Sequence, residues 1–308
     1  MGTLKKQVKI SGVGIHSGNT VKMVVKPSKN KGIVFCRTDI NSEPILASFD
    51  NVGETKMRNT TIGDIGGAHV QTIEHLMAAF FITGIDSAIV EIDGPETPIL
   101  DGSAYEFIHA FIDAGITSSK LKQIIVKKEI IAKSSDIKVP FLIKAKYCIL
   151  NKLAGRKTSG YVKLSPNNGK ELNISATLIY PEKIIGNQSF SYKYNGTKKS
   201  QKDFIDNVAR ARTFGKYSEW EYLKKHGMGR GANEHNVIAL NNDGDGTLNP
   251  VLWKNEFVRH KIVDLVGDMF TSGGIINANI VSYKGSHALN NLVLRKLFSN
   301  PENYEIIE

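Results

Sequence analysis

Residues 260–268 read His-Lys-Ile-Val-Asp-Leu-Val-Gly-Asp, and this stretch decides how the chain is interpreted. In a helix, His260, Asp264 and Asp268 are spaced i, i+4 and i+8, so their side chains lie on one face. Most residues between them are apolar, and three polar groups on one stripe need a physical reason. An imidazole and a carboxylate four residues apart can bind one divalent metal ion. Asp268, one turn beyond Asp264, is placed to orient a neighbouring group.

Glu74 and His75 form a second candidate site at the start of a predicted helix over residues 72–84. Thr72 is the candidate N-cap of this helix, and Gly84 is the candidate C-cap. Adjacent helical side chains project about 100° apart, so the pair cannot face one ion symmetrically. His75 could bind a metal while Glu74 takes a proton from the water that a catalytic metal activates. A lone helical histidine is more often structural, so both interpretations stay open here.

His287 and Thr213 have similar pairs of interpretations. His287 lies in Lys-Gly-Ser-His-Ala-Leu-Asn-Asn (284–291), between a predicted strand and a predicted helix. It is either an ordinary residue near an N-cap or a protonated side chain held charged by Asp268. Thr213, within Ala-Arg-Ala-Arg-Thr-Phe-Gly (209–215), either caps a turn or donates a hydrogen bond to a developing oxyanion.

The bulk composition is that of a folded protein. The 308 residues are 41% hydrophobic, which allows a core in one large or two smaller domains. No apolar run approaches the ~20 residues that a membrane-spanning helix needs, and residues 1–8 lack the apolar region of a signal peptide. Cys36 and Cys148 do not indicate a disulfide framework or a thiolate zinc site. These features predict a cytoplasmic protein.

The net charge of +10 is local. Residues 120–163 carry twelve Lys and Arg against two acidic residues, which accounts for the whole excess. This block lacks the aromatic platform on which single-strand nucleic-acid binders stack bases. We therefore expect no nucleic-acid partner, at most peripheral membrane contact, and a monomer.

The order of elements predicts two α+β halves, residues 1–119 and 120–300. Residues 138–158 have no clean period and are interpreted as an extra basic insert. In the first half we expect strands at 8–10, 21–25, 32–36 and 87–92 and helices at 72–84 and 104–115. In the second half we expect strands at 124–126, 161–164, 172–179, 236–240 and 277–283, and helices at 204–212, 217–225, 257–270 and 287–296.

Six stretches in a fixed order resemble UDP-3-O-acyl-N-acetylglucosamine deacetylases, the zinc amidases of lipid A biosynthesis. The resemblance covers residues 5–297, and six ordered motifs are far more specific than a single His-Asp pair. It implies an α+β fold with two domains of similar β-α-α-β layout, the active site between them and a small insert in each. The stretches are residues 12–18, 72–76, 98–104, 211–215, 257–268 and 285–291.

The resemblance also implies a role for each site residue. A Zn²⁺ ion, or Fe²⁺ on the same ligands, would be bound by His75, His260 and Asp264, with no other cofactor. Glu74 would be the general base and His287 the charged acid or electrostatic partner, and which of them protonates the leaving amine stays open. The resemblance further implies that Asp268 orients His287 and that Thr213 donates a hydrogen bond to the oxyanion. Lys261 would contact the nucleotide diphosphate, and Phe214 would contact the face of the sugar.

Two regions depart from the family pattern. The acyl-passage insert would fall at about residues 226–243, where Arg230, Glu234 and His235 leave the acyl-chain length open. The insert at 138–158 interrupts the region of a substrate-binding lysine, for which Lys157 is the candidate. Two alternatives remain: a zinc amidohydrolase acting on another N-acylated sugar, and a binding protein with a closed, structural zinc site.

Overall fold

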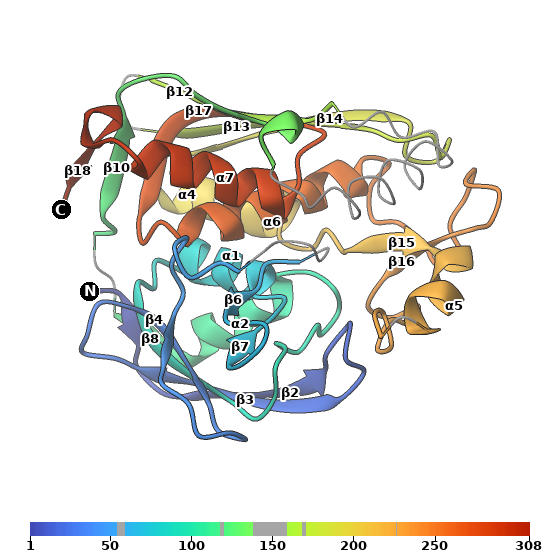
Figure 1. The fold of residues 1–308 in the computed structure, drawn as a ribbon, viewed down its shortest axis with the longest axis horizontal. Helices are drawn as coiled ribbons and strands as arrows, with labels where there is room; N and C mark the ends of the chain where they lie inside the picture. The colour runs from blue at the N-terminus through green and yellow to red at the C-terminus, as the bar shows by residue number, and fades with distance from the viewer. Residues whose placement is uncertain (54–58, 118–119, 138–158, 168–170, 226) are drawn as a thin grey trace.

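Two β-sheets enclose a double layer of helices in the computed structural model (Figure 1). The predicted basic insert 138–158, with Lys157, lies outside the described residues. The α+β fold class is confirmed by this mixture of helices and sheets. The structure describes residues 1–53, 59–117, 120–137, 159–167, 171–225 and 227–308.

The first sheet has the strand order β2-β3-β8-β4-β5. Its strands alternate between buried and exposed side chains, and on β3 the buried set is Val21, Met23 and Val25. This period of two places one face of the sheet against the helices. The elements of this layer are β2 (Val8–Val13), β3 (Thr20–Pro27), β4 (Gly32–Arg37), β5 (Ile45–Leu46), β8 (Ser87–Ile92), α1 (Glu74–Thr83) and α2 (Tyr105–Ala114).

The second sheet is built around β17, which is flanked by parallel β10 and β13 and antiparallel β12. Helices α4, α6 and α7 lie beneath it (Figure 1). The elements of this layer are β10 (Gln123–Val126), β11 (Ile130–Lys133), β12 (Tyr161–Ser165), β13 (Leu172–Ile179), β14 (Asn187–Tyr194), β17 (Ile275–Tyr283), β18 (Tyr304–Ile307), α4 (Lys198–Asn207), α6 (Glu256–Phe270) and α7 (His287–Phe298).

A small module projects from one end of the molecule (Figure 1). In it, α5 (Tyr217–Lys225) connects the parallel strands β15 (Phe214–Lys216) and β16 (Ile238–Leu240). We call these elements and the loop between them, residues 214–240, the satellite module. The remaining short elements are β1 (Thr3–Leu4), β6 (Ile62–Gly63), β7 (His69–Val70), β9 (Ile116–Thr117), η1 (Ser134–Asp136) and η2 (Pro301–Asn303).

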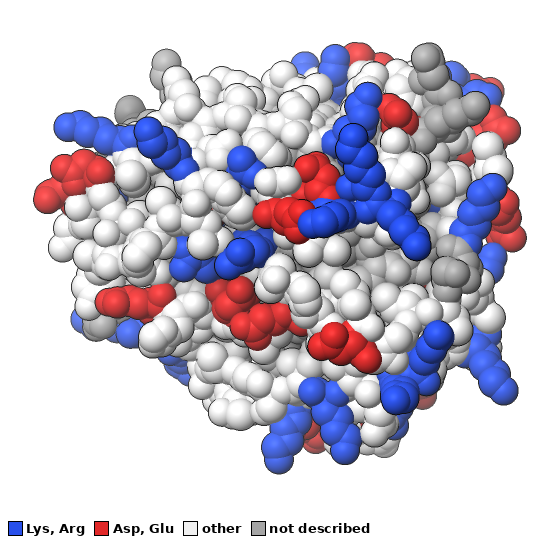
Figure 2. Space-filling model, turned by 180° about the vertical axis from the view of Figure 1, so that it is seen from behind, with Lys and Arg blue, Asp and Glu red and all other residues white. Residues whose placement is uncertain are grey.

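The buried apolar side chains of both layers form one continuous cluster. The division into domains at residues 119 and 120, like the insert at 226–243, therefore stays a prediction. Among the described residues, no helix is both long and apolar enough to cross a bilayer. On the face shown in Figure 2, basic and acidic side chains are interspersed rather than gathered into one field.

Two local predictions were wrong. The helix predicted over residues 204–212 is α4, which begins earlier because the Thr197 side chain caps it by accepting from the Ser200 N–H. It ends before Val208, whose backbone leaves the helical region. Thr72 is not an N-cap. It adopts a φ of 59° and its hydroxyl donates to Glu96, so α1 begins two residues later.

Candidate metal centre and active site

Helices α1 and α6 meet backbone to backbone at Gly267. A Cβ on this residue would lie 1.9 Å from the Glu74 carbonyl oxygen, so no other side chain fits without moving a helix. Glycine inside a helix costs roughly 1 kcal/mol relative to alanine. The close approach that offsets this cost brings the start of α1, with Glu74 and His75, against the polar face of α6.

The polar face of α6 and His75 form a buried three-residue cluster. The Asp264 Oδ1 atom lies 3.4 Å from His75 Nε2 and 3.3 Å from His260 Nε2. One ligand atom from each residue lies within 4.8 Å of the other two. All three side chains are buried, so this convergence is not a chance meeting of surface groups.

The protonation of the cluster suits a cation. His260 Nδ1 lies 3.0 Å from the Ala211 carbonyl oxygen, which can only accept, so Nδ1 carries the proton and the Nε2 lone pair faces Asp264. Burial lowers the pKa of His260 to about 3, which keeps the ring neutral. Burial opposes ionisation of Asp264, but the neighbouring His260, Lys261 and His287 hold the pKa of that carboxyl well below its usual range.

Asp264 Oδ1 has no hydrogen-bond donor within the described part of the chain. A buried carboxylate oxygen without a donor that faces an imidazole lone pair is unfavourable by itself, and a metal ion would satisfy both atoms. Two imidazoles and one carboxylate are a ligand set typical of zinc sites that keep a further position open. The donor atoms present therefore fit a divalent metal ion.

Glu74 lies beside this cluster with one oxygen fixed and one directed inward. Its Oε2 accepts the Thr60 backbone N–H at 3.0 Å, and its Oε1 lies 3.8 Å from His287 Nε2. Burial raises the pKa of the Glu74 carboxyl. A carboxylate with a raised pKa has increased proton affinity, as a general base requires.

His287 is a buried cation at neutral pH. Its Nδ1 donates to Asp268 Oδ2 at 2.8 Å, and its Nε2 lies 3.9 Å from Asp264 Oδ2. Burial opposes the charge, but the carboxylates of Asp268 and Glu74 outweigh it and raise the pKa of His287 to about 9. The Nε2–H of His287 therefore points to the space between Glu74 and the three-residue cluster of His75, His260 and Asp264.

Lys261 contacts the cluster directly, and Phe214 lies next to it. Lys261 Nζ donates to Asp264 Oδ2 at 2.7 Å and lies 5.5 Å from the centre of the Phe214 ring. The Phe214 ring is 6.2 Å from that of His260. Thr213 directly precedes Phe214 in the sequence, and its backbone N–H donates to the Gly102 carbonyl oxygen at 2.9 Å. The structure thus gathers the two α1 residues, the four α6 residues and His287 directly, and places the Phe214 ring beside His260, with Thr213 preceding it in the chain.

Sequence reasoning missed two members of the buried network, Thr60 and Asn290. The Thr60 hydroxyl donates to Asp268 Oδ1 at 2.5 Å, and Asn290 Nδ2 donates to Asp268 Oδ2 at 2.8 Å. Asn290 lies three residues after His287 on the same helix, so helical spacing could have found it. No spacing connects Thr60 with the residues that it contacts.

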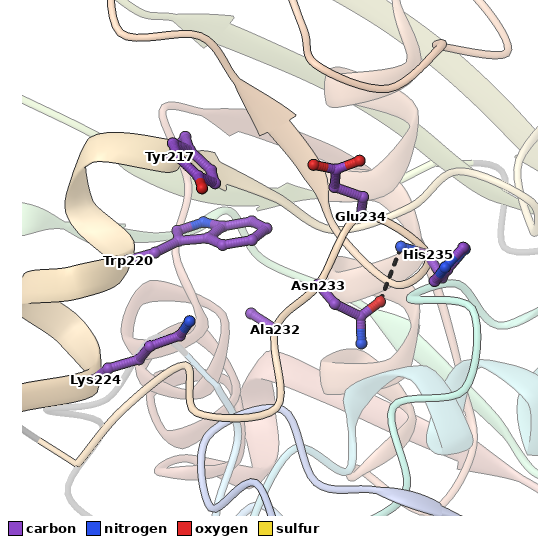
Figure 3. Close-up of a pocket in the computed structure, with 7 residues that line it drawn as sticks. All are labelled: Tyr217, Trp220, Lys224, Ala232, Asn233, Glu234 and His235. Atoms are coloured by element: carbon purple, nitrogen blue, oxygen red, sulfur yellow. Dashed lines mark hydrogen bonds between the residues drawn. The ribbon is translucent and has the colours of Figure 1, made fainter.

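Two hollows bear on the site, one at the cluster and one in the satellite module. The first adjoins the cluster and is lined by Lys261, Asp264, His287 and Asn290 together with parts of β13 and β17. The second is a cavity of about 380 Å³ in the satellite module. Figure 3 shows its aromatic and basic side chains on α5 and its polar side chains on the loop before β16. Its lining residues are Tyr217, Trp220, Lys224, Ala232, Asn233, Glu234 and His235.

An α+β fold with two imidazoles, a carboxylate and a buried acid-base pair at its centre defines a candidate metal-dependent hydrolase. The profile of the UDP-3-O-acyl N-acetylglycosamine deacetylase family matches residues 1–299, and the chain belongs to this family. This confirms the resemblance described above.

Individual relatives agree. The chain is 32% identical over 308 residues to the UDP-3-O-acyl-N-acetylglucosamine deacetylase of Mannheimia succiniciproducens. The alignment covers 99% of this chain and 92% of the relative. It is 34% identical over 312 residues to the enzyme of the same name from Neisseria meningitidis serogroup C, with the same coverage. The similarity therefore spans the site and the satellite module alike.

Proposed function

We propose that this chain hydrolyses the N-acetyl group of UDP-3-O-acyl-N-acetylglucosamine, giving acetate and UDP-3-O-acyl-glucosamine for lipid A biosynthesis. The observation that carries the proposal is the buried convergence of His75, His260 and Asp264 beside Glu74 and charged His287. Three metal-binding side chains with an adjacent carboxylate and imidazolium suit amide hydrolysis, which requires a base, an acid and stabilisation of an oxyanion.

His75, His260 and Asp264 would hold Zn²⁺, and Fe²⁺ suits the same donor set. When bound, the ion supplies Lewis acidity, which lowers the pKa of water towards ~7 and polarises a carbonyl. His260 is prepared for this role because the Ala211 carbonyl fixes its tautomer. A ligand whose ring cannot turn keeps its lone pair directed at the ion.

Glu74 takes a proton from the attacking water, whose oxygen forms a bond with the acetyl carbon. The Thr213 side chain donates to the developing oxyanion. The carbon–nitrogen bond then breaks, and the proton held at Glu74 or at His287 goes to the leaving nitrogen. Asp268 keeps His287 charged and oriented throughout by accepting its Nδ1–H.

Lys261 and Phe214 bind the rest of the substrate. The Lys261 side chain is 27% exposed, so its ammonium group can reach the diphosphate from the rim of the site. The Phe214 ring next to it offers an apolar face to the sugar. For the whole protein we further propose a cytoplasmic monomer without a nucleic-acid partner.

The decisive experiment measures metal content and acetate release together, with the purified full chain and UDP-3-O-acyl-N-acetylglucosamine as substrate. We expect release that is lost with a chelator and restored by Zn²⁺. Substrates without the UDP or the acyl group separate this activity from that of another amidohydrolase. Failure of a hydroxamate to compete for the metal, together with full metal content and no acetate release, would contradict the proposal and favour a structural ion.

A further inference from the structure

Thr60 contacts the proposed base and the proposed acid at once. Its backbone N–H donates to Glu74 Oε2 at 3.0 Å. Its hydroxyl donates to Asp268 Oδ1 at 2.5 Å, and the hydroxyl oxygen lies 3.2 Å from His287 Nδ1. The residue is 2% exposed, so water does not replace any of these contacts.

We propose that Thr60 is a positioning residue for the deacetylation: its hydroxyl fixes Asp268 and, through Asp268, the ring of His287. The inference rests on the proposed function and adds a residue to it. Thr60 does not exchange a proton with substrate. It sets the direction in which His287 presents Nε2–H to the reacting groups.

Asp268 accepts hydrogen bonds from two separate segments of the chain. Its Oδ2 accepts from His287 Nδ1 and from Asn290 Nδ2, both on α7. Its Oδ1 accepts from Thr60, which lies on a different segment, before β6. Donors on one helix alone would let the carboxylate plane turn about its last torsion, which is a soft one. The Thr60 hydroxyl holds the other oxygen and so fixes the plane.

The hydroxyl also binds His287 directly. Because Thr60 Oγ1 donates its own hydrogen to Asp268, its lone pairs can accept the Nδ1–H of His287. That hydrogen is then shared between Asp268 and Thr60. A ring held by two acceptors has less freedom to rotate than a ring held by one, and precise orientation raises the rate of a chemical step.

The segment around Thr60 is anchored independently of this hydroxyl. Asn59 Nδ2 donates to Thr72 Oγ1 at 2.9 Å, and the Thr60 carbonyl accepts from the Ile73 N–H at 3.3 Å. Removing the hydroxyl should therefore leave the backbone in place, including the N–H that holds Glu74. A substitution of nearly the same shape isolates the contribution of one oxygen atom.

The test is steady-state deacetylation of UDP-3-O-acyl-N-acetylglucosamine by the metal-loaded full chain. Thr60→Val removes the hydroxyl, and we expect kcat to fall about 10- to 100-fold, at or below the lower end of the range for proton-transfer groups themselves, with KM and metal content little changed. Thr60→Ser restores the hydroxyl and should restore most of kcat. The matched control is Thr61→Val, because the Thr61 hydroxyl contacts Asn59 and not Asp268.

A double-mutant cycle tests the route through Asp268. In an Asp268→Ala background, Thr60→Val should cause a smaller further loss than in the wild type, because the contact with Asp268 is already gone and only the contact with His287 Nδ1 remains. Additive losses would overturn the proposal, and so would a Thr60→Val variant with wild-type kcat. If Thr60→Val does not fold, Thr60→Ala replaces it, and equal kcat for the Ala and Ser variants overturns the proposal. An inactive wild type would instead contradict the proposed function itself.

Discussion

The helical centre and the satellite module use charged residues in opposite ways. In the centre, Glu74, Asp264, Asp268 and His287 are all buried, and each has a neighbour that fixes its protonation or direction. In the satellite module, charged side chains line an open cavity around two aromatic rings (Figure 3). Its own small core is centred on the Trp220 indole.

The difference separates two kinds of requirement. Buried charges are costly and remain only where they are paired, so the centre tolerates one arrangement. A cavity at the edge of the fold can change its lining without leaving a buried charge unpaired. We therefore expect substitutions in the centre to stop the chemistry, and substitutions in the satellite module to change which substrates are preferred.

Among variants that keep the metal, the largest effect is expected from Glu74→Gln. The amide can still accept the Thr60 N–H but cannot take a proton, so kcat should fall roughly 10²- to 10⁴-fold. Acetate release and metal content are measured on the same sample. Full metal content with lost activity separates a base from a ligand, whereas wild-type activity would remove Glu74 from the mechanism.

Metal removal is the next test of the centre. Chelation should abolish acetate release, and Zn²⁺ at a hundredfold excess over its dissociation constant should stabilise the fold by about 2.7 kcal/mol. Thermal unfolding with and without Zn²⁺ measures this difference. His260→Ala should remove the stabilisation together with the activity. A melting temperature that is the same with and without Zn²⁺ would mean that the cluster does not bind this ion.

The dependence of activity on pH should have two limbs. The pKa of Glu74 is raised, so activity should rise with pH as this group loses its proton above the usual range of a glutamate. His287 must keep its proton, so activity should fall as pH passes its pKa, at about 9 or below because a bound cation lowers it. Asp268→Asn removes the carboxylate that raises the pKa of His287 most and should move the alkaline limb down.

The raised pKa of His287 also makes the stability of the fold depend on pH. His287 has a raised pKa in the fold, so its stabilisation is complete below the unfolded value of about 6.5 and is lost as pH rises through about 9. Urea unfolding of wild type and Asp268→Asn at pH 6 and pH 9.5 measures the change. Equal losses of stability in the two proteins between pH 6 and pH 9.5 would show that Asp268 does not raise the pKa of His287.

The α6 stripe was predictable because the spacing of His260, Asp264 and Asp268 is a property of one helix. The position of His75 against that stripe was not derivable from spacing. It was implied by the family resemblance, and its structural cause is the close approach at Gly267, which depends on two helices far apart in the sequence. Local periodicity describes single elements, and contacts between distant elements need the fold.

Two other differences have separate causes, one in the local pattern and one in a tertiary contact. Strand β14 is absent from the predicted elements, although Phe190, Tyr192 and Tyr194 stand at alternate positions and give a period-two signal. Thr72 fits the sequence pattern of an N-cap, but Glu96 binds its hydroxyl instead and the residue takes up a positive φ. Tertiary hydrogen bonds decided this position against local preference.

The smallest catalytic effect, and the one that tests the satellite module, is expected from Trp220→Ala. The indole packs on Val237 and Ala239, with Ile15 from the first layer beside them. Its removal should enlarge the cavity of about 380 Å³ and destabilise the fold by about 3–5 kcal/mol. If the predicted acyl-passage insert is correct, kcat/KM for longer acyl chains should rise relative to shorter ones by roughly tenfold, comparable with one or two methylenes in an apolar pocket.

The matched control is Tyr222→Ala, an aromatic residue of the same helix that is 50% exposed and does not line the cavity. It should leave the acyl preference unchanged. Metal content and the alkaline limb should be the same in both variants, because neither substitution reaches the helical centre. A Trp220→Ala protein that loses its metal would show that the two regions are coupled, and one with unchanged acyl preference would place the acyl chain elsewhere.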